Sequence, residues 1–177
     1  MDLYSTATRY LDAFQADMKR DFRLIPNAEY ADRRFPLYAM LELEETATLL
    51  RKNGKSVFSY EFCYFDVCEH LNEDTVSYYC SVLDDMAAKY VPWDEPTHGF
   101  SMLSMVVLVD GAPDRALQKR IRKYKHEETR KRPKDGYGWC SCRLCIVDMS
   151  DGNCYTNRHG SALGNRTSTT AKQIAGS

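Results

Sequence analysis

The sequence predicts one α+β domain, built from a mixed, largely antiparallel sheet with helices packed on it in the order α-βββ-α-β-α-ββ. Apolar stripes of helical spacing alternate with runs of β-type pattern, and turn dipeptides typical of hairpins occur in both halves of the chain. The 177 residues, 44% hydrophobic and 28% charged, suffice for one core. We expect the domain to span residues 1–163 and the small, polar residues 164–177 to form a flexible C-terminal tail.

The first predicted element is an N-terminal helix of roughly five turns. Its apolar positions recur at steps of three and four residues, and they are Leu3, Ala7, Tyr10, Leu11, Phe14, Met18 and Phe22. Pro26 ends any continuation, because proline lacks the amide hydrogen of an interior helical residue. A polar loop is expected to follow.

Three strands are predicted next. Residues 35–43 alternate apolar and other side chains with the two-residue period of a half-buried strand. A short strand over 46–51 leads into Asn53-Gly54, a strong hairpin signal because both residues tolerate a positive φ. The return strand, 56–65, is aromatic on one face.

A second helix and a buried strand follow. Asn72 and Asp74 are natural N-caps for a helix that Pro92 stops. Residues 100–109 are apolar on both faces, which is typical of a strand in the middle of a sheet. A third helix begins after Pro113, with an inner stripe that we expect to contain Leu117, Ile121 and Tyr124.

Charge is distributed unevenly. Residues 1–110 contain ten Lys and Arg against nineteen Asp and Glu, a balance of −9, whereas residues 111–177 contain fourteen against six, a balance of +8. Residues 115–134 alone contain ten Lys and Arg and two Glu. The candidate binding residues for nucleic acid or an acidic partner are Arg115, Lys119, Arg122, Lys123, Lys131 and Arg132.

This basic segment has other interpretations. It can be a solvated face, or it can interact electrostatically with the acidic first half of the same chain or of a second copy. No helix-turn-helix, zinc-finger or aromatic RNA-binding signature accompanies the charge. A binding surface for an unknown protein partner, self-association and nucleic-acid binding therefore all stay open.

Four of the seven cysteines fall in the stretch GYGWCSCRLCIVDMSDGNCYTNRHG, residues 136–160. Residues 139–149 are predicted to form a strand, with Asp151-Gly152 as the turn and 154–157 as its partner. Alternation then places Cys140 and Cys142 on one face and Cys145 on the other, so these thiols do not converge on one ion. In the expected register Cys154 lies opposite Met149.

We therefore expect the cysteines to pack as small apolar side chains, with no metal, no cofactor and no disulfide framework. The N-terminus lacks the pattern of a secretory signal, and the longest apolar run, residues 105–109, is too short to cross a bilayer. These observations predict a soluble cytoplasmic protein without a membrane partner.

No catalytic constellation is evident. The order of elements over residues 4–109 resembles the core of the PD-(D/E)xK nuclease fold, but its strand offers Glu61-Phe62-Cys63 where that signature needs a lysine. The acidic pairs Glu44-Glu45 and Asp84-Asp85 diverge, because neighbouring side chains point apart. We expect binding rather than catalysis, with a degenerate nuclease-like protein as an alternative.

The segments FPLYA, SMLSMVVLVDGAPD, IRKYKHEETRKR and above all the cysteine-rich stretch resemble a family of uncharacterised bacterial proteins, a domain of unknown function. The resemblance spans Phe35 to Gly160. It implies a bacterial cytosolic setting and no established activity, so it assigns no catalytic residue.

Overall fold

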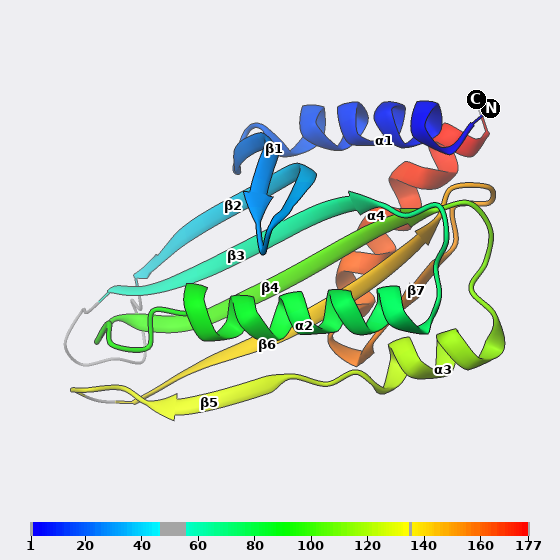
Figure 1. The fold of residues 1–177 in the computed structure, drawn as a ribbon. Coiled ribbons are helices and arrows are strands. Elements are labelled where there is room, and N and C mark those ends of the chain that lie inside the picture. Colours follow the sequence, from blue (N-terminus) through cyan, green and yellow to red (C-terminus); the bar gives the residue numbers. More distant parts are fainter. Residues whose placement is uncertain (1, 47–55, 135, 177) are drawn as a thin grey trace.

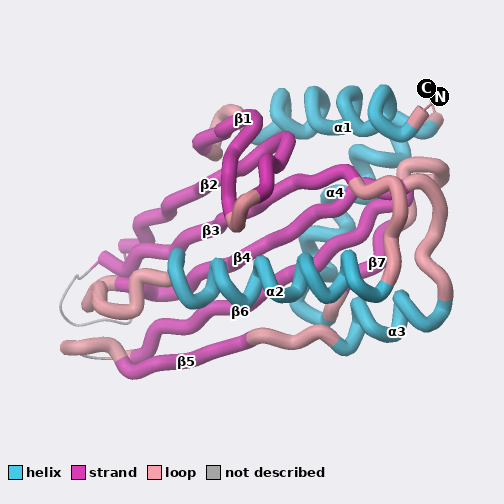
Figure 2. Tube along the Cα trace, viewed as in Figure 1, coloured by secondary structure: helices cyan, strands magenta, loops and turns pink. Residues whose placement is uncertain are grey.

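The computed structural model describes residues 2–46, 56–134 and 136–176. Within these ranges a mixed seven-stranded sheet lies between two layers of helices (Figures 1 and 2). The helices are α1 (Leu3–Met18), α2 (Glu73–Tyr90), α3 (Arg115–Lys123) and α4 (Ser161–Ala175), with a short 3₁₀ helix at Arg158–Gly160. The strands are β1 (Arg23–Tyr30), β2 (Arg33–Thr46), β3 (Ser56–Val67), β4 (His98–Val109), β5 (Glu127–Lys131), β6 (Tyr137–Asp148) and β7 (Cys154–Thr156).

The predicted α+β class and order of elements are confirmed, with β5 and α4 added. The strands lie in the order β1-β2-β3-β4-β6-β5, and β7 pairs with β6. The two pairings of β4, with β3 and with β6, are parallel, and the other described pairings are antiparallel. The sheet is therefore mixed and largely antiparallel, as expected.

The sheet divides the core in two. On one face, α2 and α3 bury residues such as Val76, Leu83 and Ile121 against even-numbered residues of β6. On the other face, α1 and α4 bury residues such as Phe14 and Ala171. Because side chains alternate along each strand, the same strands contribute residues to the core on both faces of the sheet.

Local signals explain the helix starts. The side chain of Asn72 accepts a hydrogen bond from the Thr75 amide, and the Thr75 hydroxyl accepts one from the Asn72 amide, which together form a capping box for α2. Asp114 caps α3 in the same way through the Leu117 amide. The expected N-cap at Asn72 and the inner positions Leu117 and Ile121 of the third helix are confirmed.

The strand pattern was also predictable where it was regular. Strand β4 lies inside the sheet and is buried on both faces from Leu103 to Val109. On β6, Cys140 and Cys142 join the core under α2, whereas Cys145 joins the core under α1 and α4. The opposite placement of these thiols is confirmed.

The register of the last hairpin differs from the expected one. Cys154 lies opposite Val147, not Met149, because the turn between the strands is longer than two residues. The shift is two residues, so Cys154 still faces the core under α4. It places the Cys154 thiol beside Cys145, as described below.

The N-terminal region needs a larger correction. Helix α1 ends at Met18, and the expected polar loop contains β1, so Pro26 lies in a strand. Strand β1 is at the edge of the sheet, where proline is tolerated. Ala31 and Asp32 both have positive φ and close the β1–β2 hairpin, although that dipeptide is not a usual signal for such a turn. The predicted strand over 46–51 and the Asn53-Gly54 turn fall largely outside the described residues.

Two further segments differ from expectation. The polar run after the third helix includes the edge strand β5, which pairs with β6. The expected flexible tail instead contributes most of α4, which buries Leu163, Gly164, Thr167 and Ala171. Small side chains allow close packing there without a conspicuous apolar stripe. No helix among the described residues is long and apolar enough to cross a membrane.

Candidate functional site

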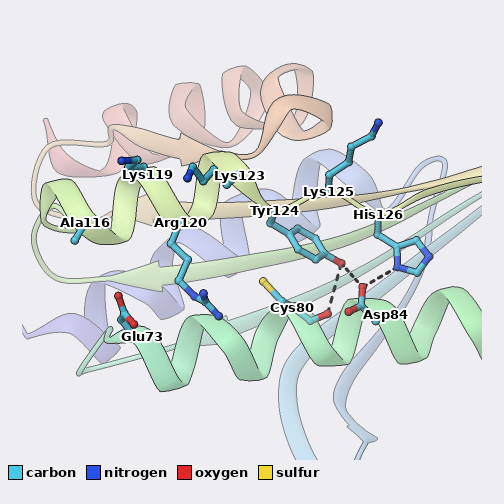
Figure 3. A pocket seen from close by; sticks show the side chains of 10 residues that line it. All are labelled: Glu73, Cys80, Asp84, Ala116, Lys119, Arg120, Lys123, Tyr124, Lys125 and His126. Carbon is cyan, nitrogen blue, oxygen red and sulfur yellow. Dashed lines mark hydrogen bonds and ion pairs between the residues drawn. The ribbon is translucent and has the colours of Figure 1, made fainter.

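A cavity of about 550 Å³ lies between α2, α3 and the segment after α3. We call it the α2–α3 pocket (Figure 3). Its lining residues are Glu73, Cys80 and Asp84 from α2, Ala116, Lys119, Arg120 and Lys123 from α3, and Tyr124, Lys125 and His126 from the segment that follows. The spacing of the residues on each helix is helical, so each helix presents one stripe to the pocket.

One end of the pocket is fixed by Asp84. Its Oδ1 atom accepts a hydrogen bond from the Tyr124 hydroxyl at 2.8 Å and lies 2.7 Å from Nδ1 of His126 (Figure 3). Burial raises the pKa of Tyr124, and the bond to Asp84 adds to that effect, so the phenol stays protonated and donates. Asp84 thus holds a tyrosine and a histidine in fixed positions.

The rest of the lining is mainly cationic. The lining contains two carboxylates, those of Glu73 and Asp84. It contains four cationic side chains, which are Lys119, Arg120, Lys123 and Lys125. Arg120 reaches toward α2, where it donates to the Ser77 hydroxyl at 2.6 Å. With histidine neutral, the lining has an excess of two positive charges, four minus two. Such a concave surface favours an anionic ligand.

The structure divides the predicted basic residues into separate groups. Lys119 and Lys123 line the α2–α3 pocket, whereas Arg115 and Arg122 are exposed without lining it. Lys131 is exposed at the end of the edge strand β5. Arg132 is buried, and its guanidinium donates to the backbone oxygen of His98 at 3.3 Å. Arg132 therefore does not belong to the exposed part of segment 115–134.

Sequence reasoning missed Arg120 and Lys125 as partners of the lysines. Helical spacing gives a signal for Arg120, because it lies three residues before Lys123 and four after Ala116 on the same helix. No local signal identifies the partner stripe on α2, because it depends on how the two helices pack. The predicted divergence of Asp84 and Asp85 is confirmed. Asp84 contacts Tyr124 and His126, whereas Asp85 contacts Tyr30 and Lys89.

The nuclease-like alternative finds little support at Glu61. Its carboxylate forms an ion pair with the buried Arg143, whose Nε also donates to Ser104 at 2.8 Å. The residue opposite Glu61 on β2 is Leu41, not a second acid. Glu61 is therefore engaged as the partner of a buried cation, and a metal would have to displace Arg143.

All seven cysteines are free thiols, and two of them lie in contact. The Sγ atoms of Cys145 and Cys154 lie 3.1 Å apart, and the Thr167 hydroxyl lies 3.3 and 3.1 Å from them. The hydrogen bond from Cys145 is the largest cause that lowers the pKa of Cys154. The pKa of Cys145 is raised by the same bond and by complete burial. We call Cys145 and Cys154 the interior thiol pair.

Most tyrosines are not available as a contact surface. Among the described residues, Tyr4 and Tyr137 are the tyrosines with strongly exposed side chains. Others pack on one another, such as Tyr38 and Tyr64 with ring centroids 4.5 Å apart. The tyrosines thus serve mainly as part of the core boundary.

Comparison with known proteins agrees with the resemblance seen in the sequence. No curated protein and no solved structure gives a significant match to the chain. A family model described as "Domain of unknown function (DUF8052)" matches residues 6–167, which include most of α1, the whole described sheet and the first part of α4. The match covers most of the chain, and the protein therefore belongs to the DUF8052 family.

Proposed function

We propose that this protein is a binding protein whose ligand is a small anion held in the α2–α3 pocket. One observation supports the proposal above all: four cationic side chains line a cavity of about 550 Å³, and of these Lys125 also lies 3.7 Å from Glu127. That volume is in the range of small-molecule pockets. Lys119 and Lys123 have no ion-pair partner among the described residues, so their charge is available to a ligand.

The chemistry of the lining favours a ligand with phosphate groups. Arginine and lysine bind phosphate oxygens through charge-assisted hydrogen bonds. The Tyr124 hydroxyl and His126 add polar groups next to Asp84. A few convergent polar groups of this kind orient a ligand in a pocket.

The test compares two pairs of residues on the same helix. Lys119 and Lys123 face the pocket, and Arg115 and Arg122 are exposed outside it. Pyrophosphate and adenosine triphosphate serve as probes in isothermal titration calorimetry at low salt. We expect the double variant Lys119→Glu/Lys123→Glu to lose at least tenfold in affinity. The matched variant Arg115→Glu/Arg122→Glu, with the same change in net charge, should stay within about threefold, because it changes only the long-range field.

Nucleic-acid binding is the second candidate, because Arg115, Arg122 and Lys131 add exposed cations outside the pocket. A polyanion would span both groups, so both double variants would weaken binding, with a steep dependence on salt. Equal losses for the two variants would overturn the pocket proposal and favour this candidate. The pocket proposal would also be overturned if neither pyrophosphate nor adenosine triphosphate gave a heat of binding at low salt.

An acidic protein partner would also use the exposed cations, and we treat it as a third outcome of the same variants.

The seven cysteines, all free thiols, support a reducing compartment such as the cytosol for this function.

A further inference from the structure

Three side chains of different chemistry meet beside the outer edge of the sheet. They are His126, just before β5, Glu128 on β5 and Cys140 on β6, and one potential ligand atom from each lies within 4.8 Å of the other two. We call them the edge trio. It is the one such group of three found among the described residues. None of the three is strongly exposed: Cys140 is buried and the other two are half-buried.

Backbone pairing produces this meeting. Glu128 lies directly opposite Cys140 in the antiparallel β5–β6 register. His126 precedes Glu128 by two residues, so the two side chains lie on the same face. The backbone oxygen of His126 accepts a hydrogen bond from the Cys142 amide at 2.9 Å, which extends the pairing beyond the end of β5. The trio thus rests on a fixed part of the sheet.

A further residue orients the histidine. The carboxylate of Asp84 lies 2.7 Å from Nδ1 of His126, and a carboxylate accepts, so Nδ1 bears the proton. Nε2 is then the basic nitrogen that a metal can bind. Tyr124 donates to the same oxygen of Asp84 and fixes the carboxylate. Histidines that bind metal usually donate their other ring nitrogen to a carboxylate or carbonyl in this way.

We propose that the edge trio binds a zinc ion through Nε2 of His126, a carboxylate oxygen of Glu128 and the thiolate of Cys140. Nitrogen, oxygen and sulfur ligands together suit Zn²⁺, whereas Mg²⁺ and Ca²⁺ prefer oxygen alone. Three protein ligands leave a fourth tetrahedral position for water or another ligand. On binding, the Cys140 sulfur loses its proton to solvent as the metal–sulfur bond forms, so one ion replaces one proton.

Two features are compatible with the site. Arg130 donates to Oε1 of Glu128, and within the described part of the chain no hydrogen bond or ion pair engages Oε2. Cys142 does not have to participate, because its sulfur contacts the backbone oxygen of Leu83. Cys140 and Cys145 lie on opposite faces of the sheet and cannot share an ion, and the trio contains only one thiol.

The metal site is independent of the anion proposal, although His126 borders both. Its test uses the full chain, freed of metal by chelation and titrated with Co²⁺, which substitutes for zinc and gives a thiolate-to-cobalt absorption band. We expect saturable 1:1 binding with that band, and displacement of Co²⁺ by Zn²⁺. Cys140→Ser should remove the band. The matched control Cys80→Ser, which removes a half-buried thiol of the α2–α3 pocket, should keep it.

Two more variants keep the test decisive if Cys140→Ser does not fold. Glu128→Gln should weaken metal affinity while the thiolate band remains. Asp84→Asn should weaken affinity by roughly 10–100-fold, again with the band retained, because Asp84 positions the ligand without touching the ion. Absence of 1:1 binding, a band that persists in Cys140→Ser, or affinity unchanged in both Glu128→Gln and Asp84→Asn would overturn the proposal. None of these readouts involves an anion, so the two proposals fail separately.

Discussion

Cys140 and Cys145 lie on the same strand in two different settings. Cys140 faces the layer of α2 and α3 beside His126 and Glu128, near the open edge of the sheet. Cys145 faces the layer of α1 and α4, 3.1 Å from the sulfur of Cys154 and covered by the Thr167 hydroxyl. Cys145 lies five positions after Cys140, and an odd offset along a strand places two side chains on opposite faces.

The comparison shows that the neighbours of a buried thiol decide its chemistry. At the edge, the partners offer nitrogen and oxygen, which together with sulfur form a ligand set for a metal. In the interior, the nearest partner is a second sulfur, and the pair can undergo thiol–disulfide exchange with an added disulfide reagent. Burial raises the pKa of Cys140 to about 11, whereas the bond from Cys145 lowers the pKa of Cys154.

The interior setting depends on how closely α4 approaches β7, and this gives the largest predicted effect. A Cβ atom on Gly164 would lie 2.7 Å from Cγ2 of Thr156, so a side chain there requires either Thr156 or the helix to shift. We expect Gly164→Val to lower the free energy of unfolding by about 2 kcal/mol, within the range of overpacked cores. Denaturant unfolding measures the change.

The neighbouring residue provides the control. Asn165 is exposed on the same helix, so Asn165→Val introduces the same β-branched side chain without the clash. Its effect should stay within about 0.5 kcal/mol. Equal unfolding midpoints for the two variants would show that the close approach at Gly164 does not contribute to stability.

The sequence predicted those elements whose side chains repeat regularly. The stripe of α1, the cap of α2 at Asn72 and the alternation of β6 are local patterns, and the structure has them. Strand β5 was missed because most of its five residues are exposed, so no apolar period marks it. Helix α4 was missed because it packs through small residues such as Gly164 and Ala171.

The candidate sites were predictable only in part. The cationic character of Lys119 and Lys123 is visible in the sequence, but the pocket they line requires α2, about forty residues earlier in the chain. The edge trio was beyond prediction, because it depends on the β5–β6 register and β5 itself was not expected. Long-range pairing, rather than residue type, determines both sites.

The second predicted effect concerns the reactivity of two half-buried thiols. Burial raises the pKa of Cys80 to about 11, whereas the pKa of Cys154 is lowered. The thiolate is the reactive form, so at pH 7.5 we expect Cys154 to react with the disulfide reagent DTNB at least tenfold faster than Cys80. Single variants Cys80→Ser and Cys154→Ser assign the two phases. A fast phase that survives in Cys154→Ser would contradict this order.

The third prediction follows the reaction at the interior pair to its end. Attack by Cys154 on DTNB releases one thionitrobenzoate and leaves a mixed disulfide. Attack by Cys145 on that disulfide then forms a Cys145–Cys154 bond and releases a second thionitrobenzoate, so the two protein sulfurs are oxidised and one reagent molecule is reduced.

The fast phase should therefore yield two equivalents of product in the wild type and one in Cys145→Ser. In that variant, mass spectrometry should find the adduct still attached to Cys154. A persistent adduct on the wild-type protein would mean that the buried Cys145 does not reach its partner on this timescale.

The smallest predicted effect is on the edge setting without metal. The side chain of His126 is 26% exposed and its partner Asp84 is 52% exposed, so water screens their interaction. In the presence of a chelator, His126→Gln should therefore change the free energy of unfolding by less than about 1 kcal/mol, in contrast to Gly164→Val. Denaturant unfolding of the two variants side by side tests this. A loss at His126 as large as at Gly164 would mean that the edge residues stabilise the fold by themselves. A small loss would show that the hydrogen bonds that orient His126 contribute little to folding.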